Sequence, residues 1–122
     1  MDGPEILRWQ ALVREVILAP HVQDYVVRLV LATHPNGEFA PPPTNQFVRW
    51  GASPRAAQAL ALAGKVRALL NSRYNVSFED VRRSYLPAMR HRVILNFEAQ
   101  AEGVESDRVL LDLLEKVPEK VG

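Results

Sequence analysis

The sequence of 122 residues predicts an all-α fold, a small helical bundle, on two observations. Apolar residues recur at spacings of three and four along several segments, as on one face of an α-helix. Prolines and glycines stand mainly at the ends of these segments or between them. Only the run 93–95 (VIL) favours an extended segment or a short strand. The length suits one domain, so we expect residues 1–122 to form a single unit.

Two amphipathic helices are expected at the start of the chain. The first spans residues 4–18, and its apolar face carries Ile6, Trp9, Val13, Val16 and Ile17. The second begins at Pro20, because proline suits the first turn of a helix, and it ends near His34. Its apolar face carries Val22, Tyr25, Val26, Leu29 and Val30. Asp24 and Arg28 are spaced to form an i,i+4 ion pair on this helix.

Residues 35–45 contain four prolines and show no apolar period, which predicts a loop or extended excursion. After it, Trp50 is expected to pack this loop onto the bundle. The third helix is predicted over residues 53–73, with seven alanines when Ala52 is counted. Small side chains on all sides indicate close packing, so we expect this helix to be central and buried against the first two.

Two further helices are expected in the second half. Ser77, followed by Glu79 and Asp80, is typical of a helix start with acid in its first turn. Pro87 should break or kink that helix. The last helix begins at Ser106 and ends at Pro118. One of its sides carries Val109, Leu110, Leu113, Leu114 and Val117.

The start of the third helix carries the candidate chemistry. Ser53 is a preferred N-cap, whose hydroxyl would accept from a free backbone N–H, and Pro54 suits the first helical position. Arg55 then falls in the first turn, where the helix dipole disfavours a cation. A bound anion would reverse that penalty, because the helix terminus offers N–H groups and guanidinium a fork of donors. The two readings are therefore a phosphate contact and an arginine that points into solvent.

Several classes of function are disfavoured. A phosphate loop is absent, since the Gly64-Lys65 pair lacks both the first glycine and the Ser or Thr that should follow. No serine lies in a G-x-S-x-G context. The chain has no cysteine and its three histidines are widely spaced, so no metal site is expected. No apolar run is long enough for a membrane span and no signal-peptide pattern is seen, so we expect a cytoplasmic protein.

The densest positive region comprises Arg82, Arg83 and residues 90–92 (RHR). It could contact the phosphates of nucleic acid or an acidic partner, or it could be a solvated face paired with nearby carboxylates. The net charge of +1 gives no strong overall attraction to nucleic acid. The alternative to a phosphate-reading site is therefore a free-standing helical module that binds nucleic acid or protein through arginine patches.

Three segments together resemble one family. These are residues 51–56 (GASPRA), 76–81 (VSFEDV) and 86–93 (LPAMRHRV), in this order and spacing. They are similar to the C-terminal lid domain of the MoxR-type AAA+ ATPases, and similar residues at 24–30 and 98–103 extend the likeness over nearly the whole chain. One departure is His34, where the family usually has arginine after the threonine.

The resemblance implies a helical lid that follows a P-loop domain, in which Arg55 matches the sensor-2 arginine and Ser53, Pro54 and Arg55 lie against ATP. The phosphate loop and the Mg²⁺ site would lie in an N-terminal domain outside this sequence, which would make Met1 an artificial start. This chain alone is then not expected to hydrolyse ATP, whereas the longer protein is expected to be an ATPase. Implied partners are that P-loop domain, neighbouring subunits of a hexamer and an unidentified client protein, without membrane or nucleic acid.

Overall fold

Helices make up most of the chain. The computed structural model describes residues 3–119, which form seven helices and one two-stranded sheet. The elements in chain order are α1 (Gly3–Glu15), α2 (Pro20–Leu31), α3 (Pro42–Phe47), β1 (Val48–Trp50), α4 (Pro54–Leu70), α5 (Phe78–Met89), β2 (Ile94–Leu95), α6 (Phe97–Ala101) and α7 (Ser106–Lys116). The predicted all-α bundle is therefore confirmed. No helix in the described part is long and apolar enough to cross a membrane.

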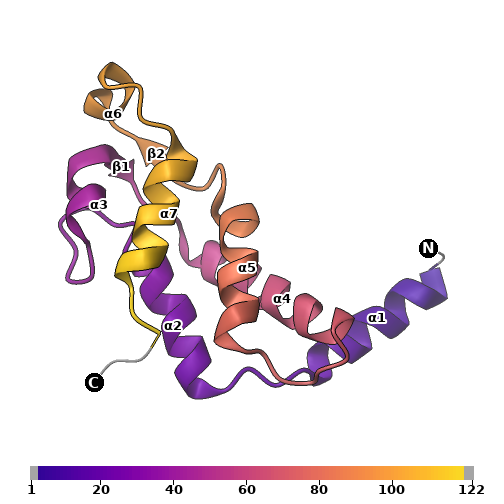
Figure 1. Cartoon of the computed structure of the whole chain (residues 1–122). Coiled ribbons are helices and arrows are strands. Elements are labelled where there is room, and N and C mark those ends of the chain that lie inside the picture. Colours follow the sequence, from indigo (N-terminus) through magenta and orange to yellow (C-terminus); the bar gives the residue numbers. More distant parts are fainter. Residues whose placement is uncertain (1–2, 120–122) are drawn as a thin grey trace.

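The core lies between α2, α4, α5 and α7, and the most extensive helix contact joins α4 to α5 (Figure 1). Its largest fully buried side chains include Tyr25, Leu29, Leu60, Tyr85 and Leu113. The apolar faces predicted for α2 and α7 are buried throughout. These faces fix how the two helices pack, because each buried aliphatic or aromatic side chain contributes about 1.5–3 kcal/mol.

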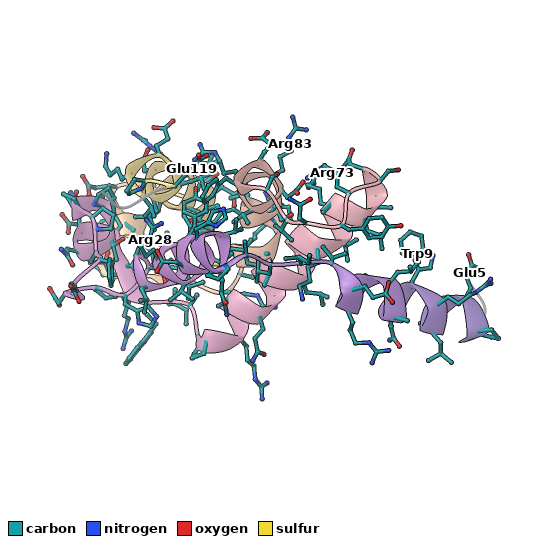
Figure 2. The ribbon with its side chains drawn as sticks, turned by 90° about the horizontal axis from the view of Figure 1, so that it is seen from below. Glu5, Trp9, Arg28, Arg73, Arg83 and Glu119 are labelled. Carbon is teal, nitrogen blue, oxygen red and sulfur yellow. The ribbon has the colours of Figure 1, made fainter. Side chains whose placement is uncertain are left out.

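The first helix differs from its prediction. It ends at Glu15 and extends away from the rest of the molecule, with Trp9 along it (Figures 1 and 2). Of its predicted apolar face only Val13 and Val16 are buried, whereas Ile6 is 42 % and Ile17 is 62 % exposed. The helix contacts the bundle mainly through α4. Its amphipathic period is therefore real, but its apolar face is only partly covered.

Part of the loop predicted over residues 35–45 is helical. Pro41 is the N-cap of α3, and Pro42 and Pro43 follow in its first turn, where a missing N–H costs nothing. Thr44 is fully buried and donates to the carbonyl of Ala32 over 2.5 Å, which docks α3 on the end of α2. The predicted loop is therefore wrong from Pro42 onward.

The extended segment expected at 93–95 is confirmed as β2, and its partner is the unpredicted β1. The two strands pair antiparallel, with Val48 opposite Leu95 and Trp50 opposite Ile94. A second unpredicted element, α6, follows at once because the side chain of Asn96 accepts from the N–H of Ala99.

In α5 the helix continues past Pro87 to Met89, so the break considered there does not occur.

The two predicted serine caps have different outcomes. The Ser77 hydroxyl accepts from the N–H of Asp80 over 3.1 Å, and the Asp80 carboxylate accepts from the N–H of Ser77 over 2.9 Å, which completes a capping box. Ser53 occupies the N-cap of α4 but makes no side-chain cap bond. The predicted capping role of the Ser53 hydroxyl is therefore wrong. Here the start of the helix is fixed by Pro54 and by the contacts of the residues before it.

Those contacts form a clamp between the end of α2 and the chain just before α4. The N–H of Ala52 donates to the Thr33 hydroxyl over 2.9 Å, and that hydroxyl donates to the carbonyl of Val30 over 2.6 Å. The His34 Nε2 lies 2.7 Å from the carbonyl of Ala52, to which it donates. A Cβ on Gly51 would lie 2.7 Å from the Thr33 carbonyl oxygen, so only glycine fits there. We call Thr33, His34, Gly51 and Ala52 the α2–α4 clamp.

An ion pair to a buried carboxylate ties the start of α5 to the segment that follows α4. The side chain of Asp80 is 2 % exposed, and both its carboxylate oxygens lie 2.6 Å from the Arg73 guanidinium. Burial alone would raise the pKa of Asp80, but the hydrogen bonds from Arg73 and Ser77 outweigh it and lower that pKa below its ordinary value. The carboxylate is therefore bound most tightly in its charged form.

We expect Ser77→Ala to lower the free energy of unfolding by about 1 kcal/mol, because it leaves the N–H of Asp80 without its cap. The matched change Ser53→Ala should alter it by less than about 0.5 kcal/mol, since that exposed hydroxyl caps nothing. Urea unfolding of both variants checks this. Equal losses at the two serines would contradict the difference between these helix starts.

We expect Thr33→Val to destabilise the chain by about 1–3 kcal/mol, because the buried N–H of Ala52 loses its acceptor while the side-chain volume is kept. Thr33→Ser retains the hydroxyl and serves as the control. Urea unfolding gives the free energy, and hydrogen exchange at Ala52 reports the clamp itself. Unchanged protection of the Ala52 amide in Thr33→Val would contradict its role.

The Asp80 pair predicts a loss of stability in acid. Because the pKa of Asp80 is lowered by folding, its contribution is complete above the unfolded value of about 3.9 and is lost as the pH falls toward the folded value. We expect Asp80→Asn to be less stable at neutral pH and to lose less stability between about pH 5 and pH 2. Glu79→Gln, at an exposed pair, is the control. An identical acid slope in Asp80→Asn would contradict the prediction.

Candidate functional site

The candidate site lies at the first turn of α4. The helix begins at Pro54, as predicted, and Ser53, Pro54 and Arg55 are all exposed. The Arg55 side chain makes no hydrogen bond or ion pair with any residue from 3 to 119. Sequence and structure therefore agree in placing a free guanidinium at this terminus.

The electrostatics of this turn favour an anion. No acidic residue lies in the first turn of α4, so the partial positive charge of the helix dipole is not offset locally. The guanidinium of Arg55 adds a full positive charge and forked donors at the same end. A carboxylate or phosphate group brought to this position would gain from both sources. The hydroxyl of Ser53 remains available to such a group, since it does not cap the helix.

The α2–α4 clamp holds this turn in place, and sequence reasoning missed it. Thr33 is fully buried, and it binds across 19 residues of sequence to Ala52, directly before the exposed turn. His34 binds the carbonyl of the same Ala52. In the sequence, this contact is signalled by Gly51 alone. The reason for a glycine there is its close approach to the backbone of Thr33, which depends on the packing of α2 beside it.

The arginine cluster of the second half is engaged within the chain. Arg82 donates to the hydroxyl of Tyr25 over 3.2 Å, and Arg83 pairs with Glu79 over 2.7 Å. Arg90 binds both carboxylate oxygens of Asp107, and Arg92 donates to the carbonyl of Ala88. Arg83 and Arg90 thus pair with carboxylates, as on the solvated face considered for the cluster, whereas Arg82 and Arg92 bind a hydroxyl and a carbonyl. They leave less free charge for nucleic acid than the sequence offers.

Trp50 does not pack the preceding loop onto the bundle. Its side chain is 60 % exposed, and the guanidinium carbon of Arg49 lies 6.0 Å from its ring centroid.

The described residues contain no cluster of three or more His, Asp or Glu side chains that could hold a metal ion. The chemistry of the site therefore rests on the arginine and the helix terminus.

Three comparisons bear on this geometry. Residues 44–113, more than half of the chain, match the family model described as the AAA lid domain. The chain is 30 % identical over 113 residues to "Chaperone MoxR1" of Mycobacterium tuberculosis, covering 93 % of this chain and 30 % of that protein. It is 28 % identical over 110 residues to "Uncharacterized protein YeaC" of Bacillus subtilis, covering 88 % of this chain and 31 % of that protein.

Among solved structures, the chain resembles that of a putative ATPase from Cytophaga hutchinsonii, with a TM-score of 0.88 and 30 % identity. The likeness covers 94 % of this chain and 35 % of that one, so the chain spans about a third of the length of the proteins it matches. The helical fold, the matched range around α4 and these relatives agree. The chain belongs to the AAA lid domain family, and it is a lid of the MoxR type.

Proposed function

We propose that this chain is the nucleotide-responsive lid of a MoxR-type AAA+ ATPase and that Arg55 acts as its sensor-2 arginine. The observation that carries the proposal is the exposed, unpaired guanidinium of Arg55 at the positive end of α4. The lid family supports a nucleotide as the anion, since its members are parts of AAA+ ATPases. In the longer protein, a P-loop domain would hold ATP with Mg²⁺ and supply the triphosphate.

The residues of this chain would then do two things. Arg55 would donate two parallel hydrogen bonds to phosphate oxygens, with Ser53 and Pro54 forming the exposed edge beside it. The α2–α4 clamp would transmit the position of this turn to the bundle, because α2 is tied to the residue before the turn. Loss of the γ-phosphate would weaken the arginine contact and release the lid to rotate. ATP occupancy would thereby be coupled to motion of the helical domain.

The proposal extends to the assembly. One relative is named a chaperone, which supports a role in remodelling client proteins. A ring of subunits would carry out this remodelling, and in it the lid would associate with its own P-loop domain and with neighbouring subunits. A hexamer, an unidentified protein client and a cytoplasmic location belong to the same proposal. Residues 3–119 offer no phosphate loop, so the chain by itself is proposed to be inactive toward ATP.

We expect Arg55→Ala to leave the stability of this chain intact while it impairs ATP hydrolysis by the longer protein. In this chain the free energy of unfolding should stay equal or rise slightly, because a cation leaves the unfavourable end of α4 and alanine favours the helix. In the longer ATPase the same change should lower kcat for ATP hydrolysis about 100-fold, since a charge-assisted contact to the reacting phosphate is lost. Urea unfolding and steady-state turnover measure the two effects.

Arg83→Ala is the control, because Arg83 is also exposed but pairs only with Glu79 at the surface. It should leave turnover unchanged. Arg55→Lys should recover only part of the activity, since an ammonium keeps the charge but lacks the fork. If Arg55→Ala unfolds the chain while the longer enzyme keeps normal turnover, Arg55 is structural and the lid mechanism is wrong.

A further inference from the structure

Helix α4 is apolar on nearly all sides, yet only one stripe along it is fully buried. Its buried stripe consists of Ala56, Leu60, Gly64 and Ala68. A second apolar stripe consists of Ala59, Leu62, Ala63, Val66 and Leu70, in which Leu62 is 55 % and Leu70 is 66 % exposed. A helix that is hydrophobic all round is ordinarily covered all round. The second stripe therefore has the composition of an interior surface but is only partly covered.

Two grooves flank this second stripe. One lies between α1 and α4, has a volume of about 560 Å³, and is walled on the α1 side by Ile6, Trp9 and Val13. The other lies between α4 and α5, also has about 560 Å³, and is walled on the α5 side by Pro87 and Ala88. Both grooves include Leu62 and Val66, so they form one continuous surface. We call it the α4 outer surface.

The charges on this surface are all positive. Arg14 lines the first groove and Arg67 lines the second, and no carboxylate lines either. Neither arginine forms an ion pair with a residue between 3 and 119. The Nε of Arg67 is buried and has no hydrogen-bond partner. A carboxylate brought to this groove would pair with the guanidinium of Arg67, whose charge has no acidic partner among residues 3–119.

We propose that the α4 outer surface is the docking site for an amphipathic helix of a partner protein. This helix carries apolar residues at helical spacing and a carboxylate directed at Arg67. A groove beside an exposed apolar stripe suits such a helix, whose anchors recur at i, i+3, i+4 and i+7. The proposal is independent of the proposed function, because it uses no residue of the Arg55 turn.

A second copy of this chain fits the surface less well. Packing two α4 outer surfaces face to face would bring the Arg14 and Arg67 side chains of both copies together, with no carboxylate on either surface to offset them. Like charges opposed across an interface are repulsive. The charge pattern therefore selects an acidic partner helix over self-association.

The test uses two fluorescein-labelled helical peptides of about five turns. They share one leucine stripe at i, i+3, i+4 and i+7, and their flanking positions carry glutamate in one peptide and lysine in the other. Fluorescence anisotropy with the intact chain should show the glutamate peptide binding at least about tenfold more tightly, a difference of about 1.4 kcal/mol. Added salt should reduce that preference, as expected for partly exposed ion pairs.

Variants of the chain locate the site. Arg67→Gln should bring the two peptides to within about threefold of each other, and Leu62→Ser should weaken both about tenfold. Leu111→Ser is the matched control, because Leu111 is 47 % exposed on α7 and lines neither groove; it should change nothing. Thermal unfolding of each variant shows whether the fold is retained.

Three outcomes would overturn the proposal. These are equal affinity of the two peptides for the intact chain, no binding of either peptide up to about 1 mM, and an equal effect of Leu111→Ser and Leu62→Ser. A stable dimer in sedimentation that Leu62→Ser dissociates would also overturn it, because the occupant would then be a second copy. None of these results touches ATP turnover, so the lid function stands or falls separately.

Discussion

The close approach of Gly51 to the carbonyl of Thr33 is the constraint on which the rest of the arrangement depends. Any side chain at position 51 would have to displace backbone, which does not yield as a flexible side chain does. This approach brings Ala52 within reach of both Thr33 and His34 and fixes where α4 leaves the small sheet. Since α4 then packs along α5, α2 and α1, its starting point determines the layout of the bundle.

The sequence predicts the longer elements well, because their stabilising pattern is local. The apolar periods of α2 and α7 and the Ser77–Asp80 capping box lie within a few residues and match the structure. The elements that were missed are short and depend on distant partners. Asn96, for example, donates from its backbone to the carbonyl of Phe47 and from its side chain to that of Gln46, about 50 residues away. No local pattern contains such a pairing.

In the candidate site, too, the sequence predicts the features that are local and misses those that depend on the rest of the structure. The exposed cation at the start of α4 follows from Ser-Pro-Arg alone, as a proline in the first turn sets the helix start. The error about the Ser53 hydroxyl came from applying a preference of N-cap residues where the hydroxyl in fact makes no hydrogen bond to the first turn. Similarly, an apolar period predicts a face that packs against other residues, but not that this chain supplies them, which is why Ile6 was expected inside.

Arg28 ties α2 to the chain near residue 119. Its buried guanidinium pairs with Asp24 and donates to the carbonyls of Pro118 and Glu119, some 90 residues along the chain (Figure 2). The same helix ends in the α2–α4 clamp. These contacts connect the chain near residue 119 to the residue before the exposed turn of α4 by way of α2, a helix of the core. A change in the position of Pro118 and Glu119 would therefore act on α2 and, through the α2–α4 clamp, on the turn that carries Arg55.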